Sequence, residues 1–251
     1  MGRFVGYEPC PKCTRMGRDS RGDNLGRYAD GGGHCFSCQY HEFPKHYVPR
    51  IEKPNVKTHL LPVDFTREVP ARALTWLLQY GLPWSYWEPI TGYSPKEERL
   101  VFLVGPSSDS PGAPVVFSIG RWVGTPSEEA SPRKWHVWGD SHKHAEVLRA
   151  PQGSGDGGMV CLVEDIVSAH KVANAGICSI PLFGTKIFDD VLYYLLQTNQ
   201  EVCLWLDKDQ ESLVRKQALR LESIINKPVK VIITEKDPKS LSFQEINENV
   251  Q

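Results

Sequence analysis

The stretch EVCLWLDKDQES, residues 201–212, begins as an apolar strand and ends in two acids that stand one residue apart. Residues two apart in a strand point to the same face, so Asp207 and Asp209 are expected side by side. Two carboxylates at the end of a core strand repel each other and lose hydration. The stretch therefore predicts either a divalent cation between the acids or a cap for a helix that begins near Gln210.

Three further segments of the last hundred residues have the composition of apolar strands, and helix-like stretches separate them. This alternation indicates an α/β arrangement, a mostly parallel sheet flanked by helices, in which ligands bind beyond the carboxyl ends of the strands. Glu164 ends the first strand, so three acids are expected at one edge of the sheet. A helix cap needs no acid from a second strand, and Glu164 therefore favours the cation. The three segments are GGMVCLVE, GICSIPLFG and VKVIIT.

Two Cys-x-x-Cys pairs lie in the first forty residues, Cys10 with Cys13 and Cys35 with Cys38. Two such pairs place four thiolates around one tetrahedral Zn²⁺. The segment NLGRYADGGGHCFSC begins between the two pairs and includes the second pair. It predicts a β-hairpin with a glycine-rich turn. A segment this short cannot fold by burial alone, so we expect the metal to supply its folding energy.

Basic and aromatic residues accompany the second cysteine pair. Cations can contact the phosphates of a single strand while rings stack on its bases, and the alternative is a solvated basic loop. His34 is an alternative zinc ligand or a surface residue. The candidates for reading a template on this predicted zinc ribbon are Arg27, Tyr28, His34 and Phe36.

The middle of the chain changes composition twice. Residues 44–66 are rich in proline, which is typical of a semi-extended linker. The segment ARALTWLLQYGL that follows predicts a short helix closed by Gly81, and RLVFLVG with PVVFSIGRWVG predicts a hairpin. The expected domains are a ribbon at 1–43, the linker at 44–66, a basic subdomain at 67–155 and an α/β subdomain at 156–251.

The composition excludes some classes of protein. The formal net charge is −1, so binding to a polyanion has to come from local patches of cations. No run approaches the roughly 18 apolar residues of a membrane span, and the first residues, MGRFVGYEPC, lack the apolar core of a signal peptide. We therefore expect a cytoplasmic protein without a membrane partner.

The strand-end acids Glu164, Asp207 and Asp209 resemble those of the TOPRIM domain of topoisomerases and primases. With a Cys₄ ribbon in front and a basic hairpin between, the chain resembles bacteriophage DNA primases, and most of all the primase half of phage primase–helicase proteins. The resemblance implies an α+β chain with a zinc ribbon, a basic mixed subdomain and a C-terminal TOPRIM domain. The segments that carry it are CPKC…HCFSC, FSIGRWVG…SPRKWHVWG, VEDIVSA, LWLDKDQ and EKDPKS.

The resemblance implies roles for the acids. Glu164 matches an acid that acts as a base or metal ligand, and Asp207 and Asp209 match the pair that binds Mg²⁺ or Mn²⁺. Asp237 stands where relatives often have a further acid near the metal. From the sequence alone it is equally a turn residue before Pro238.

The sequence departs from the family pattern directly after the first acid. Many relatives have glycine after this acid and a further acid three positions later, where this chain has Asp165 and Ser168. Asp165 either replaces the missing acid as a further catalytic group or caps the helix that begins there.

The resemblance also implies roles for cations. Arg121, Arg133 and Lys134 match residues that hold template or nucleotide phosphates, although surface charge is their default interpretation. Lys186 follows a strand and could reach a triphosphate, but an ordinary surface lysine is an equal alternative.

The function that the resemblance implies is template-directed synthesis of short RNA primers from NTPs on single-stranded DNA. It would use one structural Zn²⁺ and a catalytic Mg²⁺ or Mn²⁺. No Gly-x-x-x-x-Gly-Lys-Ser/Thr loop is present, so a separate replicative helicase is expected as a partner beside the replicative DNA polymerase. The rivals are a non-catalytic recombination mediator, which need not keep the acids, and a TOPRIM nuclease, which usually accompanies an ATPase domain.

Overall fold

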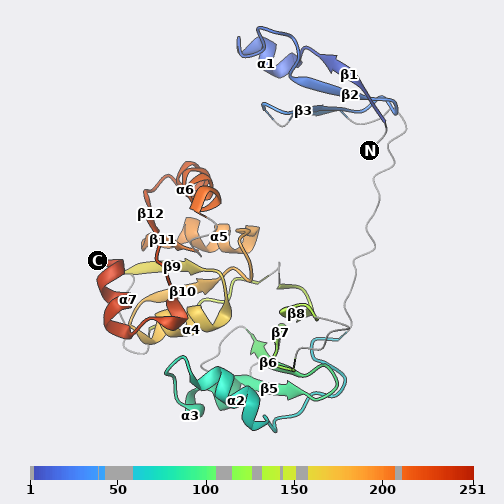
Figure 1. Cartoon of the computed structure of the whole chain (residues 1–251). Helices are drawn as coiled ribbons and strands as arrows, with labels where there is room; N and C mark the ends of the chain where they lie inside the picture. The colour runs from blue at the N-terminus through green and yellow to red at the C-terminus, as the bar shows by residue number, and fades with distance from the viewer. Residues whose placement is uncertain are drawn as a thin grey trace. The chain divides into compact units, whose positions relative to one another are not determined.

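The structure is a computed structural model that forms two compact units, Met1–Asn55 and Val56–Gln251 (Figure 1). It gives no side-chain description for His41 and Ser212. The residues it describes are 3–38, 40–42, 59–105, 115–125, 132–141, 144–150, 158–206 and 211–251.

The first unit is a small antiparallel sheet with one short helix. The predicted hairpin is confirmed: β2 pairs with β3, and Gly31 takes a φ of +82° in the turn between them. The strand order is β1-β2-β3-β4. The elements are β1 (Phe4–Glu8), α1 (Pro11–Arg15), β2 (Leu25–Tyr28), β3 (Gly33–Cys35) and β4 (His41–Glu42).

The core of the first unit is very small. Among the residues of this unit that the structure describes, the fully buried apolar side chains are three cysteines and one leucine, with Cys38 and Tyr40 packed against them in part. Burial of so little surface cannot offset the conformational entropy of about fifty residues. The buried residues are Cys10, Cys13, Leu25 and Cys35.

The second unit contains an antiparallel sheet of order β5-β6-β7-β8. The predicted hairpin of β6 and β7 and the predicted helix α2 are both confirmed. Gly81 takes a φ of +80° three residues after α2 ends. The elements are α2 (Ala71–Leu78), α3 (Trp84–Trp87), η1 (Glu88–Ile90), β5 (Thr91–Ser94), β6 (Arg99–Val104), β7 (Phe117–Trp122) and β8 (Trp135–Trp138).

The predicted linker begins in residues outside the described ranges and ends in residues that contact the antiparallel sheet. Ser118 Oγ donates a hydrogen bond of 2.6 Å to the carbonyl of Leu60, and Ser94 Oγ donates one of 2.8 Å to Asp64. Thr66 forms an isolated bridge with Tyr93. The described part of this segment therefore belongs to the second unit and contacts its antiparallel sheet through polar groups, which its composition did not predict.

The predicted parallel sheet is confirmed in the second half of this unit. All its paired strands are parallel, and their order is β10-β9-β11-β12. The strands are β9 (Met159–Val163), β10 (Cys178–Pro181), β11 (Glu201–Trp205) and β12 (Val229–Ile232). The helices are α4 (Ile166–Asn174), α5 (Asp189–Gln197), α6 (Glu211–Ile225), η4 (Pro238–Ser240) and α7 (Phe243–Val250).

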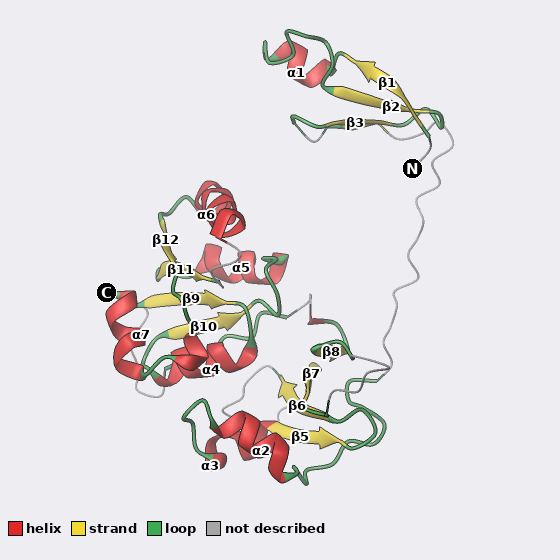
Figure 2. Ribbon diagram, in the orientation of Figure 1, coloured by secondary structure: helices red, strands yellow, loops and turns green. Residues whose placement is uncertain are grey.

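Helices cover both faces of the parallel sheet (Figure 2). One core cluster joins the sheet to α5 and α6, and a second joins its other face to α4 and α7. The chain moves from β9 outward to β10 and later from β11 outward to β12. The strand order therefore reverses between β9 and β11, which is where open α/β sheets bind ligands.

None of the described helices is long and apolar enough to cross a membrane.

His170 of α4 is buried where this helix meets α3. Its Nδ1 lies 2.6 Å from the Tyr86 hydroxyl, and its ring centroid lies 5.1 Å from that of Trp87. Burial lowers the pKa of His170 to about 3. The ring is therefore neutral in the folded protein over the pH range in which an exposed histidine becomes protonated.

His170 should make the protein sensitive to acid. The unfolded state takes up a proton near pH 6.5 and the folded state only near pH 3, so folding stability falls as the pH decreases between these values. Glutamine does not titrate. We therefore expect His170→Gln to reduce the slope of the free energy of unfolding against pH by up to about 1.4 kcal/mol per pH unit. Urea unfolding at a series of pH values measures this. His136→Gln, at a half-exposed histidine, is the control, and parallel curves for wild type and His170→Gln would contradict the prediction.

Candidate functional site

Four cysteines of the first unit form a cluster that can hold a metal ion. Their Sγ atoms all lie within 4.8 Å of one another. The distance is 3.6 Å between Cys10 and Cys38 and 3.7 Å between Cys13 and Cys35. A tetrahedral site with Zn–S bonds of about 2.3 Å has sulfur–sulfur edges of about 3.8 Å. The cluster therefore fits Zn²⁺ in size and in donor type.

Backbone groups of the two knuckles point at the sulfurs. The N–H of Cys13 donates to Cys10 Sγ at 3.5 Å, and the N–H of Cys38 donates to Cys35 Sγ at 3.4 Å. Burial raises the pKa of Cys35, but the N–H groups of Cys38 and Ser37 and the neighbouring thiols outweigh it and lower this pKa, whereas burial raises the pKa of Cys10 and of Cys13. Such N–H···S bonds favour the thiolate, which is the form that binds metals.

An aromatic face covers one side of the first unit. Phe4 lies 4.9 Å from Tyr7, and Tyr7 lies 6.3 Å from Phe36, measured between ring centroids. A β-bulge between Phe4 and Gly6 shifts the register of β1, which brings two rings three positions apart into one cluster. A Cβ on Gly26 would lie 2.8 Å from the Phe36 ring, so glycine is needed beneath the face. The aromatic face consists of Phe4, Tyr7, Tyr28, His34 and Phe36.

The other template-reading candidate of the ribbon has a different environment. The guanidinium of Arg27 forms ion pairs with Glu8, at 2.7 Å, and with Glu42. These contacts tie β2 to β1 and β4 and raise the pKa of Arg27. Arg27 is therefore engaged within the sheet, whereas the rings of Tyr7 and Phe36 are more than half exposed.

The acids predicted at the edge of the parallel sheet are described in part. Glu164 directly follows β9, and its carbonyl accepts a hydrogen bond of 3.0 Å from the N–H of Gly184. The pairing of Val163 with Trp205 puts Glu164 level with Leu206, the residue after β11. Asp207 and Asp209 lie outside the described residues. Glu164 and Leu206 thus lie at the carboxyl ends of β9 and β11, where the strand order reverses.

Asp165 caps α4 and also binds a lysine. Its Oδ1 accepts hydrogen bonds from the N–H groups of Val167 and Ser168, and its Oδ2 accepts one of 2.9 Å from Ser168 Oγ. Lys239 Nζ lies 2.9 Å from the same Oδ2 and also forms an ion pair with Asp237. Both carboxylate oxygens of Asp165 are therefore engaged, which agrees with its interpretation as a helix cap.

Arg121 and Tyr80 complete a charged cluster with Asp165, Asp237 and Lys239. Burial raises the pKa of Tyr80, and the charges of the other four residues act on it as well. Burial also lowers the pKa of Arg121, against the effect of Tyr80 and Asp165. The cluster joins residues from the turn after α2, from β7, from the start of α4 and from the segment around η4.

The guanidinium of Arg121 packs on two indole rings. Its Cζ lies 5.1 Å from the ring centroid of Trp76 and 5.6 Å from that of Trp135. Its Nε is buried and has no hydrogen-bond partner among the described residues. Stacking on indoles orients a guanidinium without using its N–H groups, so these remain able to contact an anionic oxygen.

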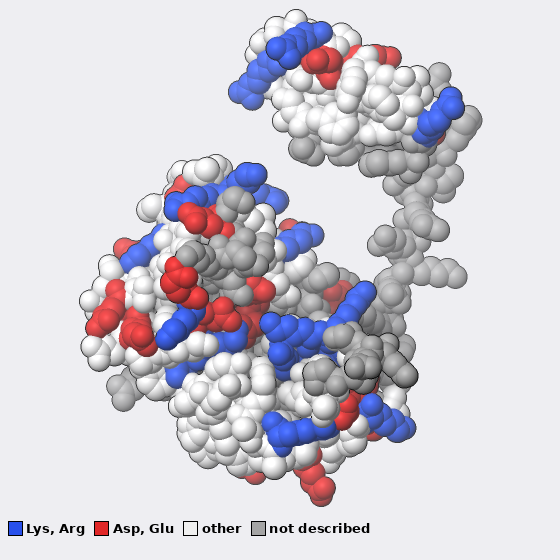
Figure 3. Space-filling view, in the orientation of Figure 1, with Lys and Arg blue, Asp and Glu red and all other residues white. Residues whose placement is uncertain are grey.

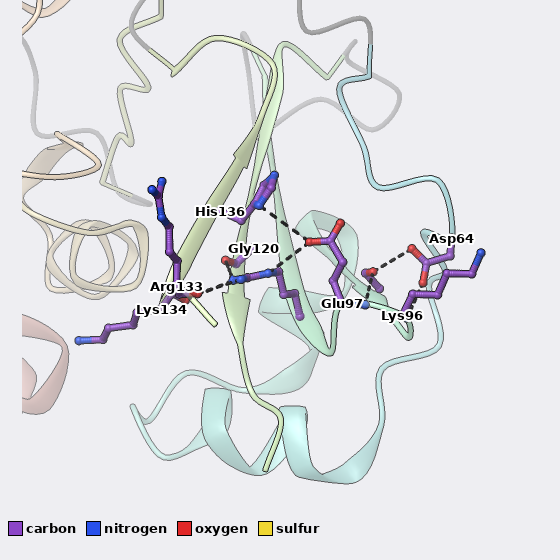
Figure 4. A network of polar contacts seen from close by, with 9 residues as sticks. Asp64, Lys96, Glu97, Gly120, Arg133, Lys134 and His136 are labelled. Atoms are coloured by element: carbon purple, nitrogen blue, oxygen red, sulfur yellow. Dashed lines mark hydrogen bonds and ion pairs between the residues drawn. The ribbon is translucent and has the colours of Figure 1, made fainter. Parts of the chain in front are cut away.

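A buried arginine supports the two cations that immediately precede β8. Arg99 Nη2 donates a hydrogen bond of 2.8 Å to the carbonyl of Arg133, and its Nη1 lies 3.5 Å from that of Lys134. Its Nε lies 3.4 Å from Glu97 Oε2. Figure 4 shows the side chains of Arg133 and Lys134 extending away from Glu97. Arg99 thus fixes the backbone of both residues and leaves their side chains to other contacts.

Charge is grouped on the surface of the second unit. Figure 3 shows Lys and Arg side chains gathered beside Asp and Glu side chains on one face of it. Lys186, in contrast, lies over the ring of Phe188 at 5.0 Å and lines a groove between α5 and α6. Arg121 is therefore linked to the charged cluster by the electrostatic effect of Tyr80 and Asp165 on its pKa, and no such link among the described residues is found for Lys186.

Several residues of these sites were not found from the sequence. Tyr80 and Lys239 contact partners more than 70 positions away in the chain, so no local pattern identifies them. Tyr7 lies in a strand with almost no buried residue, which hides the alternation that predicts strands. In the sequence, Arg99 is only the polar first residue of an apolar strand, and nothing there indicates that it is buried.

Lys239 should matter strongly for stability. Burial lowers the pKa of Lys239, but Asp165 and Asp237 outweigh it and raise the pKa above its ordinary value. The contribution of the ion pairs is therefore fully present below about pH 10.4 and is lost only as the pH rises through the higher folded value. We expect Lys239→Met to lower the free energy of unfolding at pH 7 by about 2–4 kcal/mol, because it leaves two carboxylates without their cation.

Urea unfolding measures the effect of Lys239→Met. Lys236→Met, at an exposed lysine of the same segment, should change the stability by less than about 0.5 kcal/mol. Equal stabilities of the Lys239 and Lys236 variants would show that the ion pairs contribute nothing.

Comparison with known proteins finds similarity in structure only. No family model and no curated protein sequence matches the chain. The primase fragment of the bacteriophage T7 primase–helicase protein is similar over 98% of both chains, with 15% identity and a TM-score of 0.49. The DnaG primase catalytic domain, in a structure bound to single-stranded DNA, is similar over 78% of this chain and 74% of its own, with 14% identity and a TM-score of 0.48.

A third similar structure is a DNA primase domain from Pseudomonas aeruginosa, with 20% identity and a TM-score of 0.43. The similarity covers 69% of this chain and 55% of that one, so the chain spans about half the length of that domain. All three structures are primases or parts of primases, the class that the sequence motifs resemble. Similarity at these sequence identities and TM-scores carries no assignment of activity.

Proposed function

We propose that the protein is a DNA primase that synthesises short RNA primers from NTPs on single-stranded DNA. The observation that carries the proposal is the edge of the parallel sheet between β9 and β11. Glu164 lies at this edge, and the charged cluster begins at the next residue, Asp165, and includes Arg121. The sequence supplies Asp207 and Asp209 immediately after Leu206. Acids for a divalent cation and cations for phosphates are the two requirements of nucleotidyl transfer.

In this proposal the chain's own residues divide the work. Glu164, Asp207 and Asp209 would hold Mg²⁺ or Mn²⁺, which aligns a hydroxyl with a phosphate and neutralises developing charge. Arg121, oriented by its indole contacts, would bind a phosphate oxygen, and Arg133 and Lys134 would bind phosphates of the template or nucleotide.

The ribbon would select the template. Its cysteine cluster would hold one Zn²⁺, and its aromatic face would stack on bases of the single strand. The boundaries of 1–43, 44–66, 67–155 and 156–251 are part of this proposal, as are a separate helicase, the replicative polymerase and a cytoplasmic site of action.

A direct assay tests the function. Purified protein, NTPs, single-stranded DNA and Mg²⁺ should yield labelled oligoribonucleotides, and omission of the metal should abolish them. Cleavage of the DNA in place of synthesis would favour the nuclease. Tight DNA binding without either reaction would favour the recombination mediator.

The aromatic face should contribute directly to template binding. Loss of stacking on one base costs about 1–3 kcal/mol. Tyr7→Ala and Phe36→Ala should therefore each weaken the binding of a single-stranded oligonucleotide about fivefold or more, while zinc content stays unchanged. Fluorescence anisotropy measures the affinity. Val5→Ala, at an exposed aliphatic residue of the same strand, is the control, and equal affinities of all three variants would contradict the role of the face.

A further inference from the structure

A groove lies between α5 and α6, on the helices that cover one face of the parallel sheet. Its empty volume is about 330 Å³, and this figure includes the open solvent at its mouth, so the groove is shallow. Among the described residues, neither Glu164 nor any member of the charged cluster lines it. The lining residues are Lys186, Ile187, Leu192, Gln217, Arg220, Leu221 and Ile224.

The walls of the groove are aliphatic. Leu221 belongs to the core beneath the helices, and Ile187 and Leu192 pack against that core, so these walls are its outer edge. Leu196 follows Leu192 by one turn of α5 and is 55% exposed, and Ile224 of α6 is 39% exposed. Apolar surface that persists outside a complete core is typical of a binding site for a partner.

The polar residues of the groove carry only positive charge. Lys186 and Arg220 are exposed cations, and no acid is among the lining residues that the structure describes. The positions three and four residues from Arg220 along α6 hold Lys216, Gln217, Ser223 and Ile224, so the helix supplies no acid to pair with it.

Arg215, on the same helix, does have an acid to pair with. Its Nη2 lies 2.9 Å from Glu211 Oε1, one turn earlier. Over α6, Figure 3 shows Lys and Arg side chains with uncharged side chains between them, alongside Asp and Glu. The two arginines thus allow a controlled comparison of substitutions. Arg220 lines the groove and has no acid beside it on its helix, whereas Arg215 is not a lining residue and forms an ion pair with Glu211.

We propose that this groove binds an acidic amphipathic peptide segment of a partner protein. Large apolar side chains of the segment insert between Leu192 and Ile224, and its carboxylates pair with Lys186 and Arg220. A single-stranded nucleic acid fits the cations but not the walls, because its bases stack on aromatic rings and the lining residues include none. A helix laid into an apolar groove with a charged rim is a recurring mode of peptide recognition.

Selection from a displayed library of random peptides, long enough to form a short helix, tests the proposal. Peptides selected on the wild-type protein should combine Asp or Glu with large apolar residues. A synthetic copy of a selected peptide should bind Arg220→Glu at least about tenfold more weakly than wild type. It should bind Arg215→Glu within about twofold of wild type, and its affinity should fall with added salt.

The structural integrity of both variants can be checked independently. Arg215 and Arg220 are exposed, so their variants should keep the thermal unfolding midpoint and the primer synthesis of the wild type. Selected peptides without acids, or with equal affinity for wild type and Arg220→Glu, would overturn the proposal, as would failure to select any peptide. Loss of oligonucleotide binding in Arg220→Glu would assign the groove to nucleic acid instead. Self-association that Arg220→Glu abolishes would assign it to a second copy of the chain.

Discussion

Replacing Asp207 or Asp209 by asparagine is expected to lower the rate of primer synthesis by about a hundredfold to a thousandfold. Mg²⁺ prefers anionic oxygen ligands, and an amide offers only a neutral one. Losing one electrostatic contact to the transition state costs on the order of 3–4 kcal/mol. Rates of oligoribonucleotide formation at saturating NTP and template measure the loss. Glu164→Gln, at the end of the neighbouring strand β9, should have a comparable effect.

Stability separates the metal site from the alternative of a helix cap. Asparagine caps a helix about as well as aspartate does, so a cap would lose little stability and the protein would stay active. Metal ligands would instead give an inactive protein whose melting temperature in metal-free buffer is unchanged or raised, because one of two like charges is removed. Asp190→Asn, at an exposed acid in the first turn of α5, is the control. Near wild-type synthesis by both variants would remove the metal site and most of the enzyme assignment.

The arrangement of the parallel sheet could be predicted in part. Apolar runs ending in Glu164 and Asp207, with helices between, were sufficient for a parallel sheet with ligand groups at one edge. The neighbour relations were not predictable, because periodicity identifies the buried face of a strand but not the strand beside it. The reversal of strand order between β9 and β11, which locates the site, therefore required the structure.

The side-chain roles at the site were harder to predict. Asp165 had two interpretations, as a catalytic acid or as a cap, and only its four contacts favour the second. Lys239 could not be identified from the sequence, because its partner Asp165 is 74 residues away. Arg27 read as a template contact because a sequence does not show that Glu8 and Glu42 flank it.

Removal of the metal from the cysteine cluster is expected to unfold the first unit and leave the second folded. The core that the structure describes in Met1–Asn55 is three cysteines and one leucine, so we expect almost all the stability of this unit to come from metal binding. Zinc in small domains of this type contributes about 10–16 kcal/mol, far more than any other single interaction in the chain. Hydrogen exchange after chelation should show loss of protection in β2 and β3 and continued protection in β9 and β11.

Substitution of one ligand tests the same dependence without a chelator. Cys35→Ser should abolish the binding of one zinc per chain and produce the same loss of protection in β2 and β3. Cys178→Ser removes a thiol that is buried in the second unit and lies 3.9 Å from the Tyr194 hydroxyl, so it should leave zinc content unchanged. The extended packing of β1 to β4 cannot persist on four buried residues alone. A Cys35→Ser protein that keeps protected amides in β2 and β3 would therefore mean that contacts other than the metal stabilise the ribbon.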